Sequence, residues 1–114
     1  LSVAEDKLIL PEPAPGSSPS WFGFLISVRP DSGLDRNSIT ARLEAHNIQT
    51  RLLFSGNIIR HPCFDTLRGT DAYRVVGNLE WTDFIMKHTF WVGVYPGITD
   101  EMTDYIAGEI LKAL

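Results

Sequence analysis

The chain has 114 residues, 44% of them apolar and 21% charged, which suits one domain with a single core and argues against disorder. Its net charge of −4, with acidic and basic residues interspersed, excludes the basic surface typical of nucleic-acid binding. The apolar runs are far shorter than the roughly 18–20 residues that span a bilayer, so we expect neither a nucleic-acid nor a membrane partner.

The cysteine and histidine content bears on compartment and metal binding. Cys63 is the single cysteine, so no disulfide can form within the chain and nothing indicates an oxidising compartment. No charged start followed by an apolar stretch resembles a secretory signal. We therefore expect a cytoplasmic protein. His46, His61 and His88 are widely spaced and supply no metal-ligand motif, so we expect no metal site.

The first 19 residues are expected to form a linker. Residues 1–9 are typical of a helix end or a linker entering from a preceding domain, and residues 11–19 are rich in proline, which forbids regular structure. The first residue is leucine rather than methionine, which supports a start inside a longer protein. We assign residues 20–114 to one domain.

Within residues 20–114 the pattern predicts three strands and three helices. The strands are expected at residues 20–29, 48–54 and 90–95, where β-branched and aromatic residues dominate. The helices are expected at residues 37–46, after a Thr82 cap and after a Thr99 cap. This order predicts the α+β class, with a small, mostly antiparallel sheet and helices on one face. The other face is left for another partner.

Polar residues of segment 51–61 are candidates for ligand binding. Arg51 stands in an otherwise apolar strand, and Arg60 follows a turn formed by Gly56 and Asn57. A guanidinium can make two parallel bonds to a phosphate or carboxylate. The same pattern is also typical of an edge-strand arginine with its head in water, and a Gly-Asn pair is common in turns. The residues alone leave both interpretations open.

Aromatic residues after the linker are also ambiguous. Trp21 and Phe22 begin a predicted strand, where aromatic side chains usually belong to the core. Alternation along that strand places the two side chains on opposite faces, so we do not expect both to line one pocket.

Three stretches that combine aromatic residues with glycine carry a family resemblance. They are Ser20–Phe24, Thr50–Pro62 and Thr89–Gly97. Together they resemble the C-terminal domain of the DegT/DnrJ/EryC1/StrS family of sugar-modifying, fold-type-I pyridoxal-phosphate enzymes, most closely the CDP-4-keto-6-deoxyglucose 3-dehydrases of lipopolysaccharide O-antigen biosynthesis. The resemblance runs from Ile9 to Leu114 and implies that the cofactor-binding N-terminal domain lies outside this chain.

The resemblance also implies site residues. In the family, the segment aligned with residues 51–62 faces the cofactor cleft, and the aromatic block after the linker reaches the cofactor. Phe22 is therefore the implied cofactor contact. The implied substrate-binding residues are Arg51, Ser55, Gly56, Asn57, Arg60 and His61. His61 stands where relatives usually carry glutamine, which implies a hydrogen-bonding role. No residue of this chain is expected to be catalytic, and no lysine has a setting suited to a Schiff base.

The reaction implied for the full-length enzyme removes the C3 hydroxyl of CDP-4-keto-6-deoxy-D-glucose with pyridoxamine phosphate, for dideoxysugar synthesis. The family resemblance further implies a [2Fe-2S] cluster with ligands outside this chain, a reductase electron donor and a homodimer. This piece alone would be inactive. An aminotransferase or a GDP-sugar 3-dehydratase of the same family is the nearest alternative. From a different class, the chain could be a stand-alone small-molecule binding or regulatory module.

Overall fold

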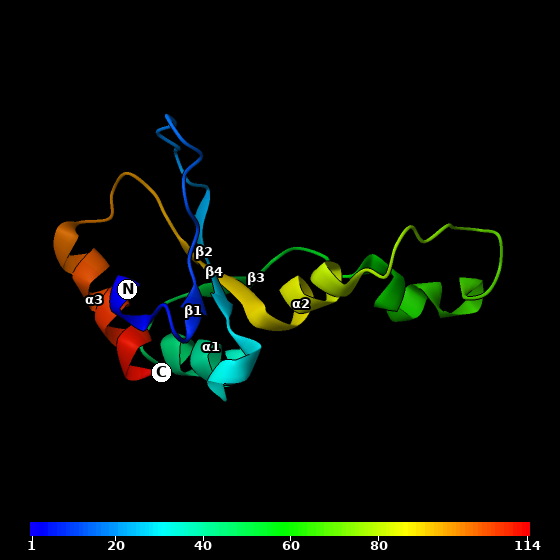
Figure 1. Ribbon diagram of the computed structural model, residues 1–114. Helices are drawn as coiled ribbons and strands as arrows, with labels where there is room; N and C mark the ends of the chain where they lie inside the picture. The colour runs from blue at the N-terminus through cyan, green and yellow to red at the C-terminus, as the bar shows by residue number, and fades with distance from the viewer.

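A computed structural model describes all residues, Leu1–Leu114, and has a four-stranded antiparallel sheet at its centre (Figure 1). The strand order is β1-β2-β4-β3. The strands are β1 (Leu8–Ile9), β2 (Gly23–Val28), β3 (Thr50–Leu52) and β4 (Thr89–Gly93). The longest pairing joins β2 to β4, from Gly23 opposite Gly93 to Ser27 opposite Thr89. The predicted α+β class with an antiparallel sheet is confirmed.

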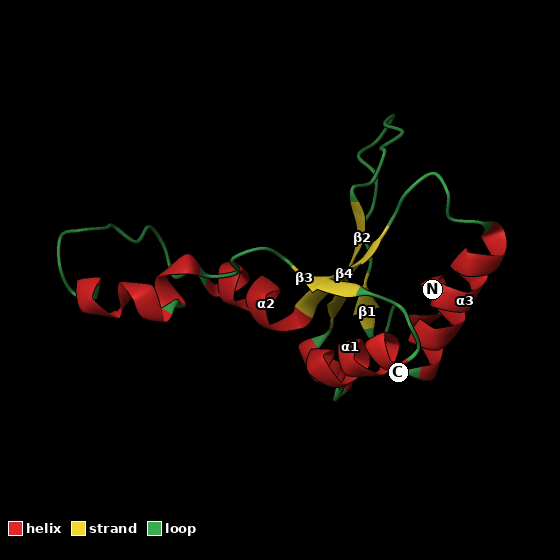
Figure 2. Cartoon of the chain, turned by 180° about the vertical axis from the view of Figure 1, so that it is seen from behind, coloured by secondary structure: helices red, strands yellow, loops and turns green.

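Two helices cover one face of this sheet. They are α1 (Arg36–Ala45) and α3 (Asp100–Lys112), while α2 (Glu80–His88) lies across the strands from α3 (Figure 2). The side chains that meet between sheet and helices are wholly or almost wholly buried: Ile26, Val28, Phe90 and Val92 from the strands, Ile39 and Leu43 from α1, and Ile110 from α3. Burial of these aliphatic and aromatic groups is the main source of stability for the domain.

Local capping chemistry sets the ends of α1 and α3. The Asp35 carboxylate accepts a hydrogen bond from the Ser38 amide at 2.8 Å and begins α1, and Asn47 at a φ of 61° follows its end. The Thr99 hydroxyl accepts from the Met102 amide at 3.2 Å, which confirms the predicted cap of α3. None of the helices has the length and apolar character needed to cross a membrane.

The predicted Thr82 cap is wrong. Helix α2 begins at Glu80, ahead of Thr82, and the side-chain oxygen of Asn78 accepts from the Glu80 amide at 3.1 Å. The N-cap position is held by Leu79 at a φ of 54°, without a side-chain cap, so the usual cap residues gave no signal for this helix start.

The N-terminal segment contributes to the core, which corrects the expectation that residues 1–19 are only a linker. Leu8 and Ile9 pair with Val28 and Ser27 as β1, and the side chains of Ala4 and Leu8 are buried. A strand of this length has no alternation to recognise, since its pairing depends on tertiary contacts. Residues 10–22, by contrast, contain no helix or strand and project from the sheet as a loop (Figure 1).

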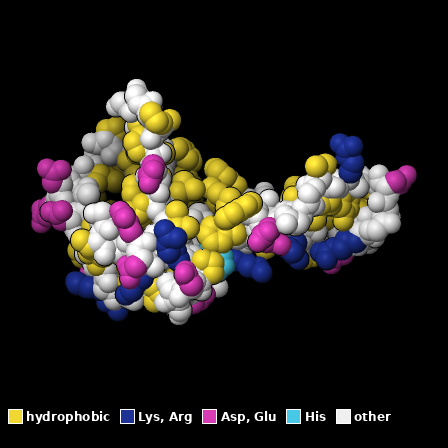
Figure 3. Space-filling view, viewed as in Figure 1, with side chains coloured by type: hydrophobic (Ala, Val, Ile, Leu, Met, Phe, Trp, Pro, Cys, Tyr) yellow, Lys and Arg dark blue, Asp and Glu magenta, His cyan; other side chains and the backbone are white.

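A second projection, the arm of residues 57–79, extends from the body beyond α2 (Figures 1 and 2). The arm contains only the short 3₁₀ helices Ile58–Arg60 and Pro62–Leu67. The radius of gyration of the chain is 16.6 Å, whereas a compact domain of this length has a value of about 13 Å. Apolar side chains gather both over the strands and on the arm (Figure 3), so much apolar surface remains uncovered.

The second face of the sheet is occupied by Trp91, which alternates with the buried Phe90 and Val92 along β4. Its indole lies directly over Gly23 of the neighbouring strand, at a place where any Cβ would overlap the ring. The absence of a side chain at Gly23 thus allows the tryptophan to lie flat across the sheet.

We predict that Gly23→Ala destabilises the chain by roughly 1–3 kcal/mol, the usual cost of overpacking, because the new methyl group displaces the indole. The measurement is the free energy of unfolding in urea. Gly93→Ala is the matched control, since Gly93 pairs with Gly23 and a Cβ there meets nothing within 4 Å. Equal stability of the two variants would contradict the packing described.

Candidate functional site

Gly56 and Asn57 lie where the chain leaves β3 and meets α2. Gly56 has a φ of +58°, and an added Cβ would lie 2.6 Å from a Met86 side-chain carbon, so glycine is required on both counts. The side chain of Asn57 donates to the Asp83 carboxylate at 2.7 Å, and its backbone amide donates to the Met86 sulfur at 3.4 Å. Asn57 is only 2% exposed. This turn is therefore fixed against α2.

Arg60 meets the same carboxylate. Its Nε donates to Asp83 Oδ1 at 2.6 Å and its Nη2 donates to Asp83 Oδ2, which is the two-pronged arrangement that guanidinium and carboxylate geometry favours. Hydrogen bonds from Arg60 and then Asn57 lower the pKa of Asp83 to about 2, and the pairing raises the pKa of Arg60. We call Asn57, Arg60 and Asp83 the latch.

His61 closes the turn next to the latch. Its ring nitrogen Nε2 lies 2.6 Å from the backbone oxygen of Ser55, so the tautomer protonated at Nε2 donates a hydrogen bond there. Five of the six predicted substrate-binding residues therefore lie in one turn, in which Asp83 binds Asn57 and Arg60: Ser55, Gly56, Asn57, Arg60 and His61.

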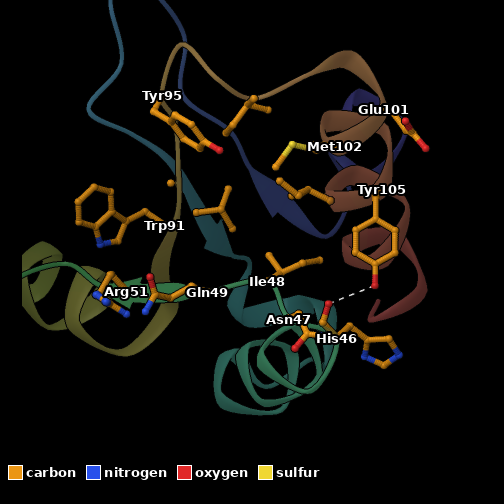
Figure 4. A pocket seen from close by; sticks show the side chains of 14 residues that line it. His46, Asn47, Ile48, Gln49, Arg51, Trp91, Tyr95, Glu101, Met102 and Tyr105 are labelled. Atoms are coloured by element: carbon orange, nitrogen blue, oxygen red, sulfur yellow. Dashed lines mark hydrogen bonds between the residues drawn. The ribbon is translucent and has the colours of Figure 1, made fainter.

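Arg51 lies apart from this cluster, on β3 opposite Trp91. It borders a groove of about 640 Å³ between the α1–β3 connection, β4 and α3 (Figure 4). One of its terminal nitrogens donates to the Thr50 oxygen at 2.9 Å. With the Gln49 amide oxygen turned toward the guanidinium, that oxygen accepts at 2.8 and 3.2 Å. Arg51 forms no ion pair, so its charge is available to an anion.

The opposite wall of the groove is formed by α3, whose first half stands away from the sheet (Figure 4). Met102 and Tyr105 face the groove from this helix, and the Tyr105 hydroxyl donates to the His46 oxygen at 3.1 Å. The groove is thus mostly apolar, with the guanidinium of Arg51 at one end.

Phe22, Phe54 and Trp91 form an aromatic platform on the open face of the sheet. The ring centroids of Phe22 and Trp91 are 4.8 Å apart, and those of Phe54 and Trp91 are 6.1 Å apart. The Trp91 indole nitrogen donates to the Leu52 oxygen at 3.2 Å, which fixes the ring. Phe22 is 76% exposed and Phe54 78% exposed, so both rings are free for a further contact. Trp91 belongs to the platform and also lines the groove.

The expectation that Trp21 and Phe22 do not share a pocket is wrong. Both line a cavity of about 140 Å³ beside the platform. They precede the first residue of β2, Gly23, so the alternation of side chains along a strand does not apply to them.

The sequence interpretation missed Asp83, Phe54 and Trp91 as site residues. Trp91 had a usable signal, because alternation with Phe90 and Val92 puts it on the face opposite the core. Asp83 had none, since a carboxylate in the first turn of a helix is ordinary and its partners lie far away in sequence.

The three lysines lie away from the platform and the groove, and two of them form hydrogen bonds. Lys7 donates to the Leu114 oxygen at 3.3 Å, Lys112 donates to Glu109 at 2.7 Å, and Lys87 lies in the last turn of α2. Cys63 is exposed, and no group of three or more His, Cys, Asp or Glu side chains is placed to hold a metal ion.

Comparison with known proteins identifies the family. The model of the DegT/DnrJ/EryC1/StrS aminotransferase family matches residues 2–111. The chain belongs to this family. It is 50% identical over 105 residues to the dTDP-4-dehydro-2,6-dideoxy-D-glucose 3-dehydratase of Saccharopolyspora spinosa, covering 92% of this chain and 22% of that protein. It is 48% identical over 109 residues to the lipopolysaccharide biosynthesis protein RfbH of Salmonella typhimurium, covering 96% of this chain and 24% of that protein.

Solved structures show the same fold. An Escherichia coli GDP-4-keto-6-deoxy-D-mannose-3-dehydratase with bound hydrated PLP matches with a TM-score of 0.78 at 24% identity, over 93% of this chain and 26% of that chain. A variant GDP-4-keto-6-deoxymannose-3-dehydratase with bound GDP-perosamine matches with a TM-score of 0.79, over 96% of this chain and 27% of that chain. This chain therefore spans about a quarter of the length of these relatives.

We predict that the Asp83 carboxyl titrates near pH 2 rather than at its ordinary 3.8. Because the folded-state pKa is lowered, the latch stabilises the folded chain fully above pH 3.8 and loses that effect as the pH falls through 2. The measurement is the ¹³C chemical shift of the Asp83 carboxyl carbon against pH.

The control for this titration is Arg60→Gln, which removes the charged partner and should move the midpoint back toward 3.8. An unchanged midpoint in the variant would show that Arg60 does not govern this carboxylate.

Proposed function

We propose that this chain is the C-terminal small domain of a nucleotide-sugar 3-dehydrase that removes the C3 hydroxyl of CDP-4-keto-6-deoxy-D-glucose, for dideoxysugars of lipopolysaccharide O antigen. The observation that carries the proposal is 48–50% identity, over more than nine-tenths of this chain, to a sugar-nucleotide 3-dehydratase and to a lipopolysaccharide biosynthesis protein. The rest of the enzyme would lie in the polypeptide that the relatives possess beyond this region.

The aromatic platform fits a planar cofactor. Phe22 offers an exposed ring fixed beside Trp91, and aromatic rings of this kind stack on flat heterocycles. Pyridoxamine phosphate, when bound, supplies an amine for the 4-keto group and an electron sink for loss of the hydroxyl. Since the lysines lie away from the platform, this chain would orient the cofactor and exclude water, while groups elsewhere move the protons.

The substrate would be held by polar groups of β3 and of the turn beside α2. Arg51, with no carboxylate partner, suits a phosphate or sugar oxygen. Ser55, Gly56, Asn57, Arg60 and His61 would contact the nucleotide sugar from the turn beside α2. A [2Fe-2S] cluster would take its ligands from outside this chain, and a reductase would supply the electrons. The enzyme would work as a homodimer in the cytoplasm.

Two alternatives are discriminated by the residues that precede this region in the gene. A Schiff-base lysine there would indicate an aminotransferase, and a histidine without cluster cysteines would indicate a GDP-sugar 3-dehydratase, to which this chain has a 30% identical relative. A stop codon and a start codon flanking this segment would instead favour a stand-alone binding module, for which the 640 Å³ groove is the candidate site.

The proposed function is tested by supplying the complete enzyme with pyridoxamine phosphate, a reductase system and CDP-4-keto-6-deoxy-D-glucose. We expect a product that lacks the C3 hydroxyl, identified by mass spectrometry and NMR. An aminated product, or no turnover of this sugar nucleotide, would contradict the proposal.

In the complete enzyme we predict that Arg51→Ala lowers kcat/KM about tenfold to a hundredfold, since a hydrogen bond to a charged group contributes about 1.5–3 kcal/mol. The thermal midpoint should change little, because Arg51 has no ion pair to lose. The control is Arg29→Ala, since Arg29 follows the last residue of β2, at the opposite end of that strand from Phe22. Near-normal kcat/KM for Arg51→Ala would exclude a binding role.

We also predict that the 114-residue chain alone forms no stoichiometric, borohydride-stable adduct with pyridoxal phosphate, because no lysine lies at the platform or groove. The measurement is mass spectrometry after reduction, with the urea-unfolded chain as control. Saturable labelling of one lysine in the folded chain only would contradict the assignment of the anchor to another part of the protein.

A further inference from the structure

Asp83 organises the turn that carries most of the proposed substrate contacts. One carboxylate oxygen accepts from both Asn57 at 2.7 Å and Arg60 Nε at 2.6 Å, and the other accepts from Arg60 Nη2. The three residues come from two separate segments, so the carboxylate on α2 ties the base of the arm to the body. The Asp83 side chain is 19% exposed and that of Arg60 is 55% exposed.

The geometry leaves part of Arg60 free. Asp83 engages the Nε and Nη2 edge of the guanidinium, and Nη1 donates to no protein group. A guanidinium has five N–H donors in a rigid plane, so fixing one edge fixes the direction in which the free edge points. A long arginine side chain without such a partner would lose rotamer freedom on binding a ligand.

We propose that Asp83 is a positioning residue for substrate binding: it holds Asn57 in place and aims the free edge of Arg60 at an anionic oxygen of the nucleotide sugar. This inference rests on the proposed function. Asp83 itself touches no substrate. Its effect is to prepare the turn before the substrate arrives, so its loss weakens binding rather than the chemical step.

The test compares Asp83→Asn, Arg60→Gln and the double variant in the complete enzyme, with CDP-4-keto-6-deoxy-D-glucose as substrate. Each single variant should raise KM about tenfold to a hundredfold and change kcat less than about threefold, because ground-state binding is lost. The double variant should be no worse than the worse single one, since both residues act as one unit. Asp83→Glu, which keeps the charge, should recover part of the loss.

The matched control is Asp65→Asn, which removes an ion-paired carboxylate within the arm, bound to Arg68, and should leave KM unchanged. A lower thermal midpoint for Asp83→Asn with unchanged KM would overturn the positioning role. Additive effects in the double variant would overturn it also. If Arg51→Ala and Asn57→Ala leave KM unchanged as well, the proposed binding site is what has failed.

A second measurement applies to the 114-residue chain and needs no turnover. In its NMR spectrum, Asp83→Asn should shift the Asn57 side-chain amide signals and speed their exchange with solvent, whereas Asp65→Asn should not. Unchanged Asn57 signals in Asp83→Asn would overturn the inference, whatever the enzyme assay shows.

Discussion

Packing of the Trp91 indole onto the bare backbone of Gly23 determines how the two faces of the sheet differ. Alternation along β4 sends Phe90 and Val92 into the core under α1 and α3, and therefore sends Trp91 to the opposite face. Because Gly23 has no side chain, the indole lies flat and supports Phe22 and Phe54. One face of the sheet is closed by helices, and the other presents an aromatic surface.

This division explains where function can arise. Trp91 joins the platform, where Phe22 is exposed, to the groove, which Arg51 borders. The latch then fixes the neighbouring turn to α2. In the proposed function these features orient the ligands, and groups elsewhere in the enzyme move the protons. In the proposed function this domain forms one wall of a cleft, and the remainder of the complete enzyme supplies the other wall.

Features set by neighbouring residues could be predicted from the sequence, whereas contacts between residues far apart in the sequence could not. The Thr99 cap, the left-handed Asn47 and the three main strands follow from short patterns. Strand β1 was missed because Leu8 owes its burial to pairing with Val28. Asp83 was missed for the same reason, since its partners precede it by more than twenty positions. The family resemblance indicated the turn formed by Gly56 and Asn57. Only the folded structure shows that the Asp83 carboxylate holds it.

The proposed function places the aromatic platform against the cofactor and the rest of the complete enzyme. Hydroxyl-radical footprinting of the 114-residue chain and of the complete enzyme tests it most directly, by comparing oxidation of Phe22, Phe54 and Trp91. We expect strong oxidation of the exposed Phe22 and Phe54 rings in the chain alone and clear protection of all three rings in the complete enzyme, with oxidation of the exposed Leu111 on α3, which lies outside the groove, as an internal reference. Equal oxidation of the three rings in both proteins would contradict it.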